Sequence, residues 1–187
     1  MEKRKLRMWI EIALFAGIGV IFNMMSINFM PQGGGISLQM IPILLIAIRW
    51  GVIAGFSTGL LMGFIDIATG VPVYHWAQVL LDHCLANAVV GFVALLNKPI
   101  HHALNNSHKR KLTLSLTAAI SMAGFFKFFV HVISGVIFFY MFADGQNVWL
   151  YSIIYNATPM VPTIGVTIVC TTLLLTSSPK LVLPKLA

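Results

Sequence analysis

The chain has 187 residues, of which 58% are hydrophobic and only 9% are charged, and its mean hydropathy is +0.90. Soluble domains contain about 25% charged residues, so this composition excludes an ordinary soluble domain and indicates an integral membrane protein. The formal net charge of +7 arises mostly beside the predicted helix ends, where it attracts anionic lipid and does not indicate a nucleic-acid surface.

Six transmembrane helices are predicted, because a span needs about 20 consecutive apolar residues. In chain order they cover residues 8–28, 37–49, 51–70, 76–97, 112–142 and 149–176. The basic start of the first helix is like a secretory signal, but no small-residue cleavage site follows it, so we expect the helix to be retained. The second helix is short and follows the sequence Pro31-Gln32-Gly33-Gly34-Gly35, which predicts a loop or a re-entrant turn. We expect one all-α transmembrane domain over residues 1–187.

The distribution of Lys and Arg predicts the orientation, because positively charged loops stay in the cytoplasm. Eleven of the twelve Lys and Arg residues lie before the first helix, between helices two and three, between helices four and five, or after the sixth. The loops expected at 29–36, 71–75 and 143–148 contain none. Both termini of the six-helix bundle are therefore predicted to be cytoplasmic.

A polar linker is predicted at 98–111, and it contains three of the six histidines. These histidines lack the tight spacing of metal ligands, so we expect no metal site. Cys84 and Cys170 both lie in apolar helices and are predicted to be packing residues without a disulfide.

Small residues recur at helical spacing on two of the predicted helices. Glycine occupies every fourth position from Gly51 to Gly63, which predicts close packing against another backbone. Ala13 and Gly17 form a shorter pair on the first helix. This pair indicates either packing inside the bundle or docking of another membrane subunit.

Asp82, Lys127 and His131 are ionisable residues that lie inside predicted spans. A charge at membrane depth costs about 2.5–3.5 kcal/mol on insertion scales, so such residues are kept where they face a polar interior. Lys127, His131 and Gly135 share one helix face at i, i+4 and i+8. Asp82 lies about 9 Å from the outer end of its helix, at 1.5 Å per residue. Asp82 and Lys127 either form a buried structural ion pair or line a site, and the two interpretations are compatible.

Further polar and aromatic residues are predicted on the outer side of the membrane. Tyr151 and Asn156 lie in the first two turns of the sixth helix, and Phe139 lies one turn beyond Gly135. This distribution predicts a cavity that opens to the outside. A carboxylate beside aromatic rings suits a flat cationic ligand, and Asn and Tyr can hydrogen-bond the edge of a heterocycle.

Four stretches carry a family resemblance over nearly the whole chain: 30–34, 41–51, 78–82 and the run from Lys127 to Pro162, with Lys-Phe-Phe-Val-His-Val-Ile-Ser-Gly and Trp-Leu-Tyr-Ser-Ile-Ile-Tyr-Asn. In order and spacing they resemble the ThiT/YuaJ family, the thiamine-specific S-components of energy-coupling-factor (ECF) transporters. The resemblance implies a six-helix substrate-binding subunit in the plasma membrane of a prokaryote, which takes up thiamine from outside and needs no cofactor. It also implies three partners, a transmembrane coupling protein and two cytoplasmic ATPases. The chain itself has no phosphate-binding G-x-x-x-x-G-K-[ST] loop, so energy has to come from partners or from an ion gradient.

The resemblance further implies roles for individual residues. Asp82 matches the acidic residue that engages thiamine, and His131 matches the histidine beside the thiazolium ring. Gly135 matches a glycine that lets the ligand approach the backbone. Tyr151 and Asn156 match residues that hydrogen-bond the ligand.

The resemblance also implies roles for residues that are not expected to hydrogen-bond the ligand. Lys127 matches a lysine that is expected to orient Asp82. Ala13 and Gly17 match the surface with which the first helix docks on the coupling protein.

The chain departs from the family in its aromatic residues. Phe139 replaces a tryptophan that stacks on the ligand, and His83 replaces a tyrosine. Glycines 33–35 stand where another tryptophan is expected. Tyr74, Trp76 or Phe29 is expected to complete the aromatic wall.

Two other functions remain as alternatives. One is an ion-coupled secondary transporter of a small cationic or aromatic solute, with Asp82, Lys127 and His131 as a proton relay. The other is a membrane enzyme with His131 as general base. No nucleophile motif, catalytic carboxylate pair or metal-ligand spacing supports the enzyme, so we expect none.

Overall fold

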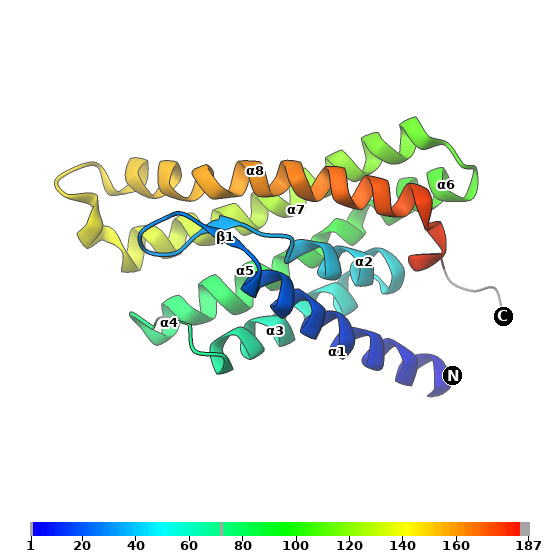
Figure 1. Ribbon diagram of the computed structural model, residues 1–187, viewed down its shortest axis with the longest axis horizontal. Helices are drawn as coiled ribbons and strands as arrows, with labels where there is room; N and C mark the ends of the chain where they lie inside the picture. The colour runs from blue at the N-terminus through cyan, green and yellow to red at the C-terminus, as the bar shows by residue number, and fades with distance from the viewer. Residues whose placement is uncertain (1, 72, 184–187) are drawn as a thin grey trace.

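The computed structural model of the protein describes residues 2–71 and 73–183. These residues form an elongated bundle of helices with one short hairpin (Figure 1). The elements are α1 (Glu2–Met24), β1 (Ile27–Asn28), β2 (Gly35–Ile36), α2 (Met40–Trp50), α3 (Val52–Ala68), α4 (Trp76–Val79), η1 (Leu80–Leu85), α5 (Ala86–Ala88), η2 (Val89–Leu96), α6 (Asn97–Asn105), α7 (Lys109–Phe138), η3 (Tyr140–Ala143), α8 (Val148–Ser177) and η4 (Pro179–Leu181).

The described residues contain four helices long and apolar enough to cross a membrane. These are α1, the continuous helix from α4 to α6, α7 and α8. The helices α2 and α3 are apolar but shorter, with 11 and 17 residues. Gly51 separates them with φ of 98°, a conformation that residues with a side chain rarely adopt. The prediction of a six-helix, all-α membrane protein is confirmed.

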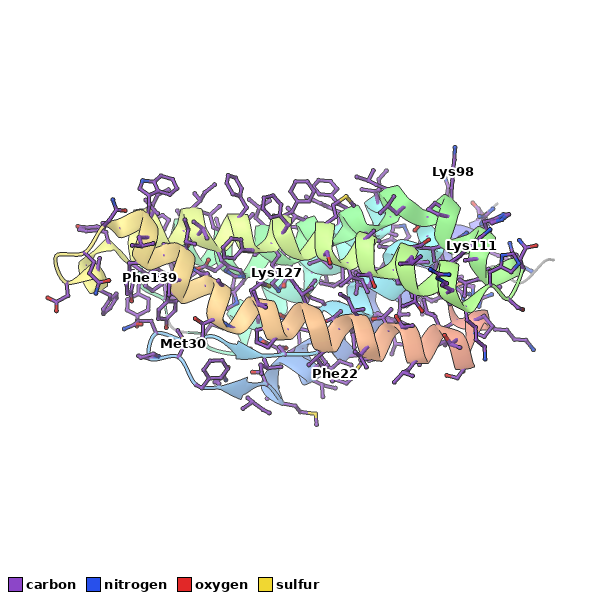
Figure 2. The ribbon with its side chains drawn as sticks, turned by 90° about the horizontal axis from the view of Figure 1, so that it is seen from above. Phe22, Met30, Lys98, Lys111, Lys127 and Phe139 are labelled. Carbon is purple, nitrogen blue, oxygen red and sulfur yellow. The ribbon has the colours of Figure 1, made fainter. Side chains whose placement is uncertain are left out.

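The positively charged ends of the helices gather at one end of the bundle. Helix α1 begins, and η4 lies, at the end of the bundle where α6 meets α7 (Figure 1). Lys98 and Lys111 lie at this end, opposite Phe139 and Met30 (Figure 2). Because positive loops stay in the cytoplasm, we expect this end to face the cytoplasm.

The first helix begins and ends earlier than predicted, at Glu2–Met24 instead of 8–28. It ends at Met24 because the following residues form an antiparallel hairpin in which Ile27 pairs with Ile36. The chain returns through Gly33 and Gly34, both with positive φ. The segment predicted as a loop therefore folds back over the outer half of the bundle (Figure 1).

The polar linker predicted at 98–111 is mostly helical, so its prediction as a connection between helices was wrong. Helix α6 continues to Asn105, and only residues 106–108 separate it from α7. The Nδ2 of Asn97 donates to the carbonyl oxygens of Ala47 and Ile48, both at 3.1 Å, and the Nε2 of His101 lies 2.9 Å from the Ile48 oxygen. The Ile48 oxygen is among the last carbonyls of α2, which lack a partner inside their own helix, and these contacts satisfy it. The Ala47 oxygen also accepts from the N–H of Gly51 at 2.8 Å. The fifth predicted helix likewise ends at Phe138, before residue 142, and η3 follows.

Apolar packing is concentrated in the cytoplasmic half of the bundle. The main core joins α1, α2, α3, η2, α6, α7 and α8, and on α7 its last fully buried member is Ala123. One turn further along α7 the side chain of Lys127 begins a polar region. The cavity described below therefore stands on a packed apolar base.

The glycines of α3 allow that helix to touch the backbone of its neighbour. A side chain at Gly55 would collide with Gly91, one at Gly59 with Asn87, and one at Gly63 with His83. The predicted close packing is confirmed for these three glycines, whereas Gly51 serves the turn between α2 and α3.

We expect Gly59→Ala to lower the midpoint of thermal unfolding in detergent. The added methyl group meets the Asn87 carbonyl, and overpacking of this kind costs about 1–3 kcal/mol. Gly165→Ala is the matched control, because a methyl group at position 165 on α8 meets nothing within 4 Å. Equal unfolding midpoints for the two variants would show that close packing at Gly59 does not contribute to stability.

Candidate functional site

A cavity of about 380 Å³ lies in the outer half of the bundle, beneath the β1–β2 hairpin. Its wall comes from α1, the hairpin, the helix from α4 to α5, α7 and α8. Lys127 lies deeper in the bundle than Phe139, which is near the outer end (Figure 2). The wall includes all nine residues predicted to bind a ligand: Tyr74, Asp82, His83, Lys127, His131, Gly135, Phe139, Tyr151 and Asn156.

A π-helical turn shapes one side of the cavity. In η1 the chain makes i to i−5 hydrogen bonds, as from the N–H of Ala86 to the oxygen of Leu81. Such a turn keeps residues five apart on one face, so Asp82 and Asn87 both reach the cavity wall. Isolated π turns occur frequently at functional sites.

Asp82 is held by two donors. The Nδ1 of His131 lies 3.1 Å from its Oδ1, and the Nε2 of Gln78 donates to its Oδ2 at 2.9 Å. The side chains of Asp82 and His131 keep 16% and 21% of their surface exposed. The carboxylate is therefore fixed in orientation yet accessible from the cavity.

Lys127 has a different partner from the one expected. Its Nζ donates to the Oδ1 of Asn87 at 2.6 Å, and its residue is only 8% exposed. Among the described residues no hydrogen bond or salt bridge joins Lys127 to Asp82. The interpretation of these two as a direct ion pair is therefore wrong, and His131 and Gln78 orient Asp82 instead.

Helices α7 and α8 meet closely where the cavity begins. A side chain at Gly135 would collide with Ser152, whose Oγ donates to the Val132 oxygen at 2.8 Å. The Nδ2 of Asn156 donates to the Ser152 oxygen at 2.9 Å. Gly135 thus serves helix packing as well as lining the cavity. The Oδ1 of Asn156 accepts no hydrogen bond from the described residues.

Tyr155 connects the hairpin to α8. Its hydroxyl accepts from the N–H of Gln32 at 2.9 Å and donates to the oxygen of Gly33 at 3.1 Å. Sequence reasoning did not select Tyr155, although it lies one helical turn after Tyr151, and the two rings are 5.6 Å apart. The spacing i, i+4 was the available signal.

The aromatic wall is formed by Tyr74 and Phe139. Their ring centroids are 5.1 Å apart in an edge-to-face arrangement, and both residues line the cavity. Trp76 and Phe29, the other candidates for this wall, are not among the cavity residues. Of the three residues expected to complete the aromatic wall, Tyr74 is the one that lines the cavity.

A second carboxylate near the cavity was missed. Asp66 on α3 is 2% exposed and accepts from the Nε2 of Gln39 at 2.8 Å and from the Nδ2 of Asn23 at 3.2 Å. The Nδ1 of His83 lies 3.9 Å from its Oδ2. The signal was present in the sequence, because Asp66 lies within a predicted apolar span just as Asp82 does.

The arrangement favours binding of a small polar ligand. It combines a fixed carboxylate, an ammonium group, aromatic edges and a free amide oxygen. In the described part of the chain, no three His, Cys, Asp or Glu side chains are placed to hold a metal ion.

Comparisons of the sequence and of the structure with known proteins all find thiamine transporter proteins. The model of the family described as thiamine transporter protein (Thia_YuaJ) matches residues 9–183. The thiamine transporter ThiT of Bacillus subtilis is 40% identical over 96% of both chains. ThiT of Lacticaseibacillus paracasei is 29% identical over 98% of this chain and 94% of its own. The solved structure of ThiT from Listeria monocytogenes has a TM-score of 0.91 and 28% identity, covering 97% of this chain and all of that one.

Proposed function

We propose that this chain, which belongs to the thiamine transporter protein family, captures thiamine from the extracellular side as the substrate-binding subunit of an ECF transporter. The chain is a multi-pass protein of a prokaryotic plasma membrane, and its class of activity is transport, not catalysis. The proposed partners are a transmembrane coupling protein and two cytoplasmic ATPases.

The observation that carries the proposal is the oriented carboxylate of Asp82 in the outer cavity. Thiamine has a permanently positive thiazolium ring, and a carboxylate in a partly desolvated cavity attracts such a ring more strongly than in water. Tyr74 and Phe139 add aromatic surface for a flat cation.

The other end of thiamine is an aminopyrimidine, which needs hydrogen-bond partners on its edge. Asn156 offers its Oδ1, which has no partner in the described residues, and Tyr151 offers a hydroxyl group that also makes no hydrogen bond there. An amide oxygen accepts from an amino group, and a phenol can donate to a ring nitrogen. We assign the pyrimidine to this side of the cavity, on α8.

The proposed mechanism is binding and reorientation without covalent chemistry. Thiamine enters from outside, the segment 30–36 closes over it, and the coupling protein carries the loaded bundle to face the cytoplasm. Tyr155 supports the closing step, because its hydroxyl is hydrogen-bonded to both Gln32 and Gly33. Energy comes from ATP hydrolysis in the partner subunits.

Titration of the purified chain by isothermal calorimetry tests the proposal. We expect thiamine to bind more tightly than thiamine phosphates, and riboflavin not to bind. Calorimetry suits this protein better than tryptophan fluorescence, because no tryptophan is among the described cavity residues. Absence of thiamine binding, or equal binding of riboflavin, would refute the assignment.

We expect Tyr155→Phe to speed dissociation of thiamine severalfold, because the hairpin loses both hydrogen bonds to the hydroxyl group. The measurement is displacement of labelled thiamine by excess unlabelled ligand. Tyr140→Phe is the control, since Tyr140 is 58% exposed and lies outside the cavity. An unchanged dissociation rate in Tyr155→Phe would show that the hairpin does not retain the ligand.

A further inference from the structure

We propose that Asp66 determines charge specificity: it lies behind the cavity wall and gives the site the net negative charge that selects a ligand with one positive charge. The inference rests on the proposed binding of thiamine. It concerns a residue that does not itself line the cavity.

The position of Asp66 places its charge directly behind three cavity residues. Its Oδ1 accepts from Asn23 and its Oδ2 from Gln39, while His83 lies 3.9 Å away. Asn23, Gln39 and His83 all line the cavity. Both oxygens of Asp66 accept from neutral amide groups, which is the arrangement of an ionised carboxylate.

The sum of charges shows why a second carboxylate matters. The cavity and the layer behind it contain Asp66, Asp82, Lys127 and the two imidazoles of His83 and His131. Among the carboxylates and the ammonium group, Lys127 offsets Asp82, and these two alone leave no net charge. Asp66 makes the total −1, so that a monocation completes a neutral site.

The positive charge of Lys127 is the reason why the site needs a second negative charge. It is 8% exposed, and its only hydrogen-bond partner in the described residues is the neutral amide of Asn87. Its positive charge therefore remains to repel a cationic ligand in a poorly solvated region. Because Asp66 has no salt bridge to Lys or Arg in the described residues, its field acts on the cavity.

A purely structural role for Asp66 makes a different prediction. By joining Asn23 of α1 and Gln39 before α2, Asp66 also ties neighbouring elements together. Loss of this tie would weaken every ligand alike, whatever its charge. A charge effect acts on cationic ligands alone.

The experiment compares thiamine with 3-deazathiamine, whose thiophene ring has the shape of the thiazolium ring without its charge. Asp66→Asn is expected to weaken thiamine binding about tenfold in calorimetry, as for a lost charge acting through a protein interior. Binding of the neutral analogue is expected to change less than twofold. Asp144→Asn, which removes the same charge from an exposed outer residue, is expected to change neither.

A charge-swapped variant, Asn23→Asp with Asp66→Asn, provides a second measurement. It exchanges the members of one hydrogen-bonded pair and keeps the total charge, so the wild-type preference for thiamine over the analogue is expected to return. If Asp66→Asn alone does not fold, this variant decides the question by itself.

Three outcomes overturn the inference: equal weakening of both ligands, no weakening of thiamine, or a folded swapped variant that lacks the preference. Each of them leaves wild-type binding of thiamine intact. Failure of the proposed function appears separately, as an absence of thiamine binding by the wild-type chain.

Discussion

Replacing Asp82 by asparagine is expected to weaken thiamine binding by more than tenfold. The variant removes the negative charge that we propose to face the thiazolium ring, and it leaves one oxygen to serve two donors, His131 and Gln78. One of those donors then loses its partner, at a cost of about 1–3 kcal/mol for a buried group. Calorimetric titration of the purified variant with thiamine is the direct measurement.

Asp144→Asn is the control for Asp82→Asn as well. Asp144 lies in an exposed outer turn with φ of 45°, a conformation that asparagine also adopts readily. The control therefore changes the total charge of the chain by the same amount without touching the cavity. Unchanged affinity in Asp82→Asn would remove this carboxylate from the site.

Ala13→Trp is expected to abolish thiamine uptake while leaving thiamine binding unchanged. Ala13 is exposed on α1, and a side chain at Gly17, one turn further, meets nothing within 4 Å. The pair therefore does not pack inside the described bundle, which leaves its surface free for another membrane subunit. A bulky indole would separate two helix backbones that need small residues to approach. Uptake of labelled thiamine into cells and calorimetry on the purified variant measure the two effects.

The control for this docking surface is Ala118→Trp. Ala118 is also an exposed alanine, a similar number of residues from the cytoplasmic start of α7, but on another helix. Normal uptake in Ala13→Trp would refute the docking assignment. Uptake that persists without the ATPase subunits and collapses with an ionophore would instead support an ion-coupled transporter.

The sequence predicted the membrane class and the family correctly, and it placed nine residues that line one cavity. Their roles in thiamine binding stay predictions. One error concerns a hydrogen-bond partner, because Lys127 was assigned to Asp82 but binds Asn87. The other concerns secondary structure, because residues 98–105 were assigned to a linker but are helical. The helical part of that segment is polar, and contacts from Asn97 and His101 to the end of α2 anchor it. Such a tertiary contact has no local signal.

By itself the sequence determined the class and the family of this protein, because hydropathy and motif order are read along the chain. The placement of Lys and Arg predicted its orientation in the same way. Only the tertiary structure decided which buried polar groups meet. Pairing depends on the rotation of each helix, and one residue changes the facing direction by about 100° in an α-helix. The π turn at η1 shifts the register after Asp82, so that Asn87 reaches Lys127 while Asp82 reaches His131. The burial of Asp66 behind Asn23 and Gln39 follows from the meeting of three segments, for which no single stretch of sequence carries a signal.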